Sequence, residues 1–164
     1  MIRLFLLNLM LLPTVSQAQD IVFAPDATIA CLDEAISVSE RLACIGASAD
    51  QCMETTDGGE TTVGMGGCFW AEYTYWDARL NASYQATLTS AKADDAELKA
   101  IGATVASVGD ALRTMQRAWL PFRDAACDYE RAQWGGGTGG GPATAACLMR
   151  MTAEQTLTLE GELY

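Results

Sequence analysis

The sequence predicts an all-α fold, a small disulfide-linked helical bundle of three main helices with an N-terminal helical hairpin. Helix-favouring residues dominate most segments, and apolar residues recur at a spacing of about 3.6 rather than alternating. Helices that each carry one apolar stripe must bury these stripes on one another, which produces a bundle. The chain also holds six cysteines, and an even number of cysteines in a small exported domain indicates disulfides.

The N-terminal residues 1–18 are typical of a secretory signal peptide. Arg3 supplies a positive charge, the stretch 4–12 is apolar, and residues 16–18 include small side chains of the kind that signal peptidase reads. The apolar run is too short to cross a bilayer, which takes about 20 helical residues. A buried N-terminal helix is the alternative interpretation. We therefore expect a periplasmic or secreted protein that begins near Gln19, has no membrane span and forms one domain over 19–164.

The first half of this domain contains two predicted helical regions and one predicted loop. Residues 27–53 indicate a short helical hairpin that carries three of the cysteines. Residues 55–67 are rich in Gly and Thr and predict a loop. Asp94 and Asp95 are placed to end the first long helix and to cap the next one. Along that first long helix runs a single stripe of Asp77, Leu80, Asn81, Tyr84 and Leu88.

The second half contains two further helices separated by a glycine-rich loop. The second long helix is expected to become regular near Asp110, because Gly102 and Gly109 weaken the preceding stretch. Pro121 lies inside this helix and predicts a kink near Arg117. Its expected buried stripe is Leu112, Met115, Gln116, Trp119, Phe122, Arg123, Ala126 and Cys127. After the loop at 134–142, WGGGTGGGP, the third helix carries a stripe of Cys147, Leu148, Met151, Gln155, Leu159 and Leu163.

The cysteine positions suggest a set of three disulfides. Cys68 opens the first long helix and Cys127 closes the second, so antiparallel helices bring both to one end of the bundle, where Cys52 and Cys147 also belong. Six cysteines allow many connectivities. The preferred one is Cys31–Cys44, Cys52–Cys147 and Cys68–Cys127. The chain has no histidine and no Cys-x-x-Cys pair, so we expect no metal site.

Polar residues on the two long stripes suggest an ion pair inside the bundle. In an antiparallel arrangement Arg123 falls within about two helical turns of Asp77, and a pair of Arg123 with Asp77 or Glu72 is feasible. The arginine fork can hold a carboxylate with two hydrogen bonds. Such a pair is either a polar functional site or a device that fixes the register of the helices, and we favour the second interpretation. Trp119 and Phe122 are expected to lie in the core.

Four short patterns follow one another along the chain: Asp77-x-x-Leu80-Asn81-x-x-Tyr84, Gln116-Arg117-Ala118-Trp119, Arg123-Asp124-x-x-Cys127 and, after the glycine-rich loop, Cys147-Leu148. In this order and spacing they resemble the LprI-type lysozyme inhibitor family, over about 52–163. The resemblance implies a small exported bacterial helical domain with disulfides and, for the founding type, inhibition of lysozyme. The chain departs from the family pattern in two ways. Cys31 and Cys44 lie in an N-terminal extension, and Gln155 stands where the family often carries an arginine.

The acidic balance of the chain restricts its partners. Removal of Arg3 with the signal peptide changes the net charge from −11 to −12, because nine basic residues then face 21 acidic ones. Such a surface repels phosphate backbones and attracts basic proteins; the alternative is that it only aids solubility. Without histidine, the Ser–His–Asp and Cys–His arrangements are impossible, and WGGGTGGGP lacks the Gly-Lys-Ser/Thr of a phosphate loop. We expect neither catalysis nor a cofactor, and no nucleic-acid partner.

The glycine-rich loop is the predicted contact with a lysozyme. Glycine lets the backbone enter a narrow cleft, and an arginine can reach the carboxylates that flank the cleaved bond in the enzyme's groove. The alternative is that the loop is only a connection between helices. A competing function is a binding module for another envelope protein or a peptidoglycan glycan, with Trp70, Trp76 and Trp134 as candidate sugar-stacking rings. The predicted contact residues are Arg131, Trp134, Gly135, Gly136, Gly137, Thr138, Gly139, Gly140 and Gly141.

Overall fold

The computed structural model describes residues 20–163, so the predicted signal peptide lies outside the described part of the chain. Within this part the chain forms helices and no strand, and three disulfides link them. The predicted all-α, disulfide-linked fold is confirmed. The expected N-terminal hairpin consists of three short helices rather than two. The elements are α1 (Asp26–Glu34), α2 (Val38–Ala43), α3 (Ala47–Thr55), α4 (Thr62–Ala100), α5 (Val108–Ala132) and α6 (Gly140–Leu159).

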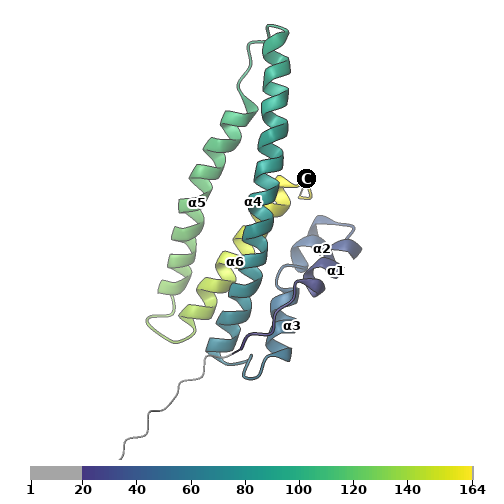
Figure 1. Cartoon of the computed structure of the whole chain (residues 1–164). Helices are drawn as coiled ribbons and strands as arrows, with labels where there is room; N and C mark the ends of the chain where they lie inside the picture. The colour runs from purple at the N-terminus through teal and green to yellow at the C-terminus, as the bar shows by residue number, and fades with distance from the viewer. Residues whose placement is uncertain (1–19, 164) are drawn as a thin grey trace, which may run out of the picture.

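The three long helices differ greatly in length, which gives the molecule a tapering shape (Figure 1). Helix α4 has 39 residues and α6 has 20, so at about 1.5 Å per residue they are about 58 Å and about 30 Å long. Helix α5 runs antiparallel to α4, and α6 packs against both of them at the end where α4 begins. Ser83 and Thr87 still bond to the end of α6, and beyond them α5 is the only described helix beside α4 (Figure 1).

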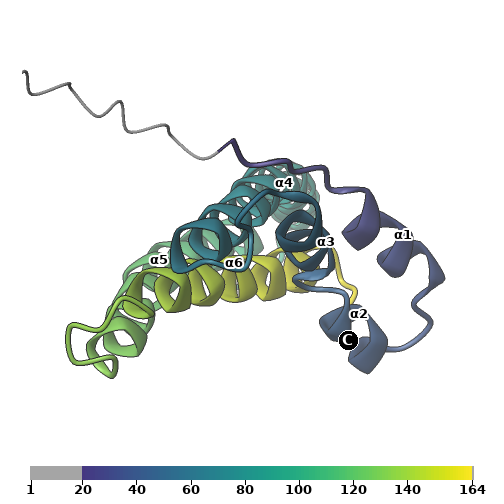
Figure 2. The same ribbon diagram turned by 90° about the horizontal axis from the view of Figure 1, so that it is seen from below.

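The short helices α1 to α3 share the core of this thicker end. Trp76 of α4 and Leu157 of α6 are fully buried, and they pack with Ala49 of α3 and Leu32 of α1. Burial of a large apolar side chain of this kind contributes about 1.5–3 kcal/mol. Seen from below, α1 and α2 lie on one side of the bundle and the α5–α6 connection lies on the opposite side (Figure 2). The N-terminal segment is thus an integral part of the domain.

Helix α4 begins earlier than the sequence predicts. The predicted loop over 55–67 is confined to 56–61, because α3 ends at Thr55 and α4 starts at Thr62. The hydroxyl of Thr61 accepts a hydrogen bond from the Gly64 amide and caps the new helix. A Cβ atom at Gly64 would collide with the backbone at Gly58. The glycine in this stretch therefore permits close packing of the first turn of α4 against the preceding turn.

The connection between α4 and α5 also differs from the prediction. Helix α4 continues through Asp94 and Asp95 and ends at Ala100. Asp95 nevertheless caps the next helix, because its carboxylate accepts hydrogen bonds from the amides of Val108 and Gly109, at 2.8 and 3.0 Å, and from the hydroxyl of Ser107, at 2.6 Å. The hydrogen bond from Ser107, followed by those from the two amides, lowers the pKa of Asp95. The cap reaches across the hairpin from inside α4.

Helix α5 buries a narrower stripe than expected. Leu112, Arg123 and Cys127 are buried, whereas Met115 and Phe122 are 40% and 64% exposed. The prediction that Phe122 lies in the core is wrong. Helix α5 is an outer helix that contacts α4 and α6 from one side only, so positions at the edge of its apolar face remain open to solvent. Pro121 lies on the exposed side of the same helix.

Two of the three predicted disulfides are wrong. Cys31–Cys44 is confirmed, but Cys52 pairs with Cys68 and Cys127 pairs with Cys147. The Cα atoms of these two pairs are 5.6 and 5.5 Å apart, which is ordinary disulfide spacing. The connections α3–α4 and α5–α6 are short, so each brings together the two cysteines that flank it. Every disulfide therefore closes a local loop.

Candidate functional site

Arg123 has a different set of partners from those predicted. Its Nε and Nη2 atoms donate to Oδ1 of the adjacent Asp124, at 2.9 and 2.8 Å, and Nη1 lies 3.4 Å from the hydroxyl of Thr152 on α6. The guanidinium lies over the rings of Trp119 and Tyr73, at 5.1 and 5.8 Å, which is cation–π geometry. Only 7% of Arg123 is exposed. The Arg123 side chain therefore contacts residues of α4, α5 and α6, and these contacts stabilise the packing of the three long helices.

The remaining residues of the predicted motif split between core and surface. Leu80 is buried, and Tyr84 is half-buried. Asn81 is exposed, and its side-chain amide donates to the carbonyl and the carboxylate of Asp77, at 2.8 and 3.1 Å. The prediction that Asp77 and Asn81 lie on the buried stripe therefore fails for Asn81. Arg117 is exposed too.

Gln116 of α5 and Gln155 of α6 form a further contact between the long helices. The side-chain amide of Gln155 donates a hydrogen bond from Nε2 to the side-chain oxygen Oε1 of Gln116, at 3.1 Å. This is a hydrogen bond between two neutral side chains. The polar residues of the α5 stripe thus serve to align α5 with α6.

Glu72, which the sequence suggests as a possible partner of Arg123, instead has partners in α1, at the start of α3 and in α4. It is fully buried. Oε1 accepts hydrogen bonds from the Thr28 hydroxyl at 2.9 Å, the Gly46 amide at 3.0 Å and the Trp76 indole at 3.0 Å, and Oε2 accepts from the Ala49 amide at 2.6 Å. Two of these donors are the amides of Gly46, the residue before α3, and Ala49 in its first turn, where amides have no helical partner. Glu72 therefore caps α3 from α4. No local pattern predicts this cap, because Thr28, Gly46 and Ala49 lie more than 20 residues away along the chain.

A second polar cluster fastens the C-terminal residues to the bundle. Arg79 holds Glu160 through two hydrogen bonds, from Nε at 3.0 Å and from Nη2 at 2.8 Å, and Arg41 binds Glu162 at 2.7 Å. Burial acts to lower the pKa of Arg79, but hydrogen bonds to Glu160 and Tyr75 outweigh it and raise this pKa. The cluster pins the chain after α6 against α2 and α4.

The glycine-rich connection between α5 and α6 is a compact turn. The Gly137 amide donates to the Trp134 carbonyl at 2.8 Å, and the Gly140 amide donates to the Gly137 carbonyl at 3.1 Å. Gly135 and Gly136 have φ angles of +55° and +86°, which glycine adopts without steric cost. Helix α6 begins at Gly140, so the predicted loop over 134–142 is shorter. Pro142 is tolerated in the first turn of α6 because an amide there has no helical partner.

The predicted contact residues lie at or beside this turn and differ in exposure. The ring of Trp134 lies so close to Gly139 that a Cβ atom there would collide with it, yet half of Trp134 remains exposed. Arg131, Thr138 and Gly141 are exposed, whereas Gly139 is half-buried and Gly140 is buried. Arg131 and four neighbouring residues also line a hollow of about 410 Å³ with Asp128. The hydrogen-bonded turn therefore places the Trp134 ring against Gly139 and leaves half of Trp134 exposed to solvent.

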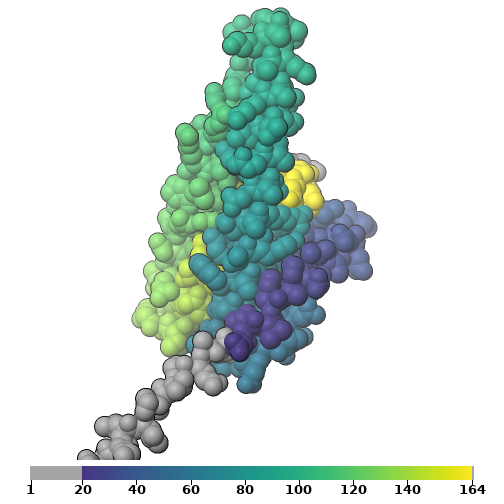
Figure 3. All heavy atoms as spheres, in the orientation of Figure 1, coloured from purple at the N-terminus to yellow at the C-terminus, as the bar shows by residue number. Residues whose placement is uncertain are grey.

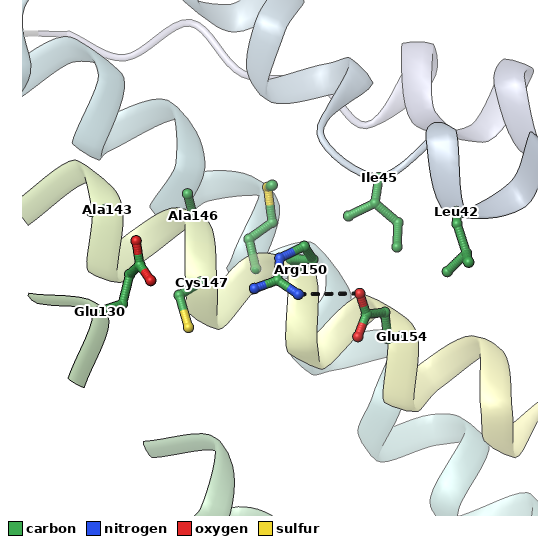
Figure 4. Close-up of a pocket in the computed structure, with 9 residues that line it drawn as sticks. Leu42, Ile45, Glu130, Ala143, Ala146, Cys147, Arg150 and Glu154 are labelled. Carbon is green, nitrogen blue, oxygen red and sulfur yellow. Dashed lines mark hydrogen bonds and ion pairs between the residues drawn. The ribbon is translucent and has the colours of Figure 1, made fainter. Parts of the chain in front are cut away.

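Another hollow lies between α2 and α6 (Figure 4). It has a volume of about 310 Å³. Leu42 of α2 and Ile45 of the α2–α3 connection face it, and Arg150 and Glu154 of α6, which pair at 3.4 Å, lie opposite. Most of its lining residues are apolar, and the charges of Arg150 and Glu154 are paired with each other. Among residues 20–163, no group of three or more Asp, Glu or Cys side chains is arranged to hold a metal ion.

A family model described as "Lysozyme inhibitor LprI" matches residues 52–159, which cover α4 to α6 and the end of α3. The chain belongs to the LprI lysozyme-inhibitor family. The LprI match excludes α1 and α2, so the Cys31–Cys44 disulfide lies in an extension outside the matched region. In the described part of this LprI-family protein, no helix combines the length and the apolar character needed to cross a membrane.

Two curated proteins are similar to this LprI-family chain. One is an uncharacterized protein of Rhizobium meliloti (strain 1021), 32% identical over 93 residues, which are 57% of this chain and 67% of the relative. The other is an uncharacterized 17.7 kDa protein from the puhA 5′ region of Rhodobacter capsulatus, 27% identical over 138 residues, 84% of this chain and 85% of the relative. No solved structure matches the chain significantly.

Proposed function

We propose that the protein is an exported lysozyme inhibitor that acts by protein–protein contact and has no catalytic activity. Membership of the LprI family over 52–159 is the observation that carries this proposal. The three disulfides support export from the cytoplasm, because disulfides persist in oxidising compartments such as the periplasm. In this proposal residues 1–18 are removed as a signal peptide, and 19–164 act as a single domain that protects the cell wall.

The charge of the protein supports a basic partner. Animal-type lysozyme is strongly basic, and this chain carries a net charge of −11. Opposite charges raise the rate of encounter, and salt screens them over about 10 Å at 0.1 M. Inhibition that depends on these charges weakens as salt is added. The contact surface predicted from the sequence is the glycine-rich turn, which would enter the groove of the enzyme with Arg131 and Trp134 at its edge.

A second candidate function is a module that binds a peptidoglycan glycan or another envelope protein. Its support is the half-exposed rings of Trp70 and Trp134, which are 53% and 50% exposed and are suited to stacking on sugars. Trp76 cannot take part, because it is fully buried and its indole donates to Glu72. Tryptophan fluorescence with peptidoglycan fragments tests this function. A shift in emission is expected only if the protein binds glycans.

Lysis of bacterial cell walls by animal-type lysozyme tests the main proposal. The oxidised protein is added at increasing ratios to the enzyme, at low and at physiological salt. Stoichiometric inhibition that weakens with salt supports the proposal. Full lysis at micromolar excess of the protein, at both salt concentrations, contradicts it. An acidic protein of the same size that lacks this fold serves as the control for non-specific binding of charge.

A further inference from the structure

The negative charge of the protein is concentrated in its N-terminal segment. Residues 20–61 contain nine acidic side chains and one basic side chain, a net charge of −8 (1 − 9), whereas 62–163 contain 12 acidic and eight basic, a net charge of −4 (8 − 12). The single basic residue, Arg41, is bound to Glu162. All nine acidic residues are exposed: Asp20, Asp26, Asp33, Glu34, Glu40, Asp50, Glu54, Asp57 and Glu60.

An exposed apolar side chain lies among these charges, at the corner where α1 turns into α2. Ile36 is 91% exposed, more than any other large apolar residue in 20–163. Its position is fixed: the amides of Ile36 and Ser37 donate to Oε2 of Glu40 at 2.8 and 2.9 Å, and the Ser37 hydroxyl accepts from the Glu40 amide at 3.2 Å. This is a complete capping box.

The same corner contains an apolar hollow of about 520 Å³. Ala30, Ala35, Ala43 and the Cys31–Cys44 disulfide form most of its lining, and Glu34 and Glu40 complete it. Ile36 follows Ala35 directly along the chain. We call Ile36, this hollow and the flanking Asp33, Glu34 and Glu40 the α1–α2 corner. An apolar centre with a charged rim is typical of protein–protein contact surfaces.

We propose that the α1–α2 corner is the surface through which the protein docks on lysozyme, a basic protein; this assignment rests on the proposed function. The net charge of −8 in 20–61 indicates which kind of partner can bind at this corner. It repels a second copy of the same chain, a nucleic acid and an anionic lipid surface, and it attracts a surface on which lysines or arginines flank an apolar side chain. Ile36 and the hollow then supply the apolar contact that charges alone do not provide.

The corner stands apart from the glycine-rich turn. In Figures 1 and 2 the α1–α2 region and the α5–α6 connection lie on opposite sides of the bundle, and Figure 3 shows the α2 region as a bulge on the flank of the molecule. One compact partner molecule therefore contacts one of these surfaces or the other. The surroundings of the turn carry mixed charge, with Arg131 beside Asp128 and Glu130, which favours the corner for a basic partner.

Calorimetric titration of animal-type lysozyme into the oxidised protein tests the assignment. Ile36→Ser is expected to weaken binding about tenfold, as for an apolar residue at the centre of an interface. Ile101→Ser is the matched control, because Ile101 is also highly exposed, at 79%, but lies at the far tip of the α4–α5 hairpin. It is expected to bind like the parent. Both substitutions are on the surface, and circular dichroism verifies that the folds are unchanged.

Charge is tested in the same way with two double variants that remove equal charge. Asp33→Asn with Glu34→Gln is expected to weaken binding and to reduce its dependence on salt. Asp94→Asn with Glu97→Gln removes the same charge at the far end of α4 and is expected to have a much smaller effect. A third variant, Arg131→Ala with Trp134→Ala, removes the predicted contacts of the glycine-rich turn and measures whether that surface contributes to binding.

The outcomes separate this assignment from the proposed function. If the parent binds lysozyme and the corner variants bind equally well, the assignment is wrong and the proposed function stands, and a loss in the Arg131–Trp134 variant then points to the turn. If the parent does not bind lysozyme, both are overturned. Sedimentation of the parent alone checks for a second copy on the corner. A dimer that Ile36→Ser dissociates would replace the assignment with a self-association surface.

Discussion

Replacement of Glu72 by glutamine tests whether this buried carboxylate holds the N-terminal helices on the bundle. Glutamine keeps the volume but exchanges one oxygen for an NH₂ group. Oε1 accepts three hydrogen bonds and Oε2 accepts one from the Ala49 amide, so in either orientation the new NH₂ group faces at least one donor. The substitution loses a hydrogen bond to a charged group, about 1.5–3 kcal/mol, and leaves a donor unsatisfied, about 1–3 kcal/mol.

Part of this loss is offset, because the folded protein no longer buries a charge. We therefore expect Glu72→Gln to lower the free energy of unfolding by about 2–4 kcal/mol, which for a chain of this size lowers Tm by roughly 6–12 °C. Denaturant unfolding with the disulfides intact, followed by circular dichroism, measures the change. Glu97→Gln, an exposed acid on the same helix, is the control and is expected to stay within about 0.5 kcal/mol of the parent. Equal stability of the two variants would refute the reasoning.

Three further predictions concern stability. Arg123→Ala should lower the free energy of unfolding by about 2–3 kcal/mol through lost ring contacts and packing; a variant that melts like the parent but loses lysozyme binding would contradict the structural role. Because hydrogen bonds from Ser107 and the α5 amides lower the pKa of Asp95, its charged form stabilises the fold above the ordinary aspartate pKa, and this contribution disappears as pH falls through the lowered value. Asp95→Asn should thus melt below the parent at pH 7 and close to it at strongly acidic pH; an equal difference at both pH values would exclude the cap. Replacing Cys127 and Cys147 by alanine opens a loop with a sequence separation of 20 and should cost about 3 kcal/mol, and an unchanged denaturation midpoint under oxidising conditions would argue against this pairing.

The sequence predicts the class of fold well because the period of the apolar residues is a local property. Leu80 and Leu88 of the α4 stripe and Cys147 and Gln155 of the α6 stripe are buried as this period predicts. The prediction is wrong for the rest of the α6 stripe, because Leu148, Met151, Leu159 and Leu163 are only half-buried. The ends of the helices are harder to predict from the spacing of apolar residues. Gly64, Gly66 and Gly67 look like loop residues, but they lie within α4, because close packing of the first turn outweighs their weak helix propensity.

The features that the sequence misses depend on contacts between distant segments. Glu72 has the same chemistry as any of the exposed acids, and only the approach of Thr28 and the α3 amides makes it a buried cap. Phe122 is as apolar as a core residue, but it is 64% exposed on α5. For the α1–α2 corner, the acidic residues are visible in the sequence, whereas the exposure of Ile36 and the adjoining hollow require the fold.

The local pairing of the cysteines divides the chain into two independently cross-linked pieces. Cys31–Cys44 and Cys52–Cys68 lie before the tip of the α4–α5 hairpin, and Cys127–Cys147 lies after it. A single protease cut between 101 and 107 therefore leaves fragments joined by packing alone, which separate on a non-reducing denaturing gel. Under the pairing expected from the sequence, the same cut would leave them covalently joined. The hairpin tip is accordingly a place where a single cut divides the domain into two parts that no disulfide joins.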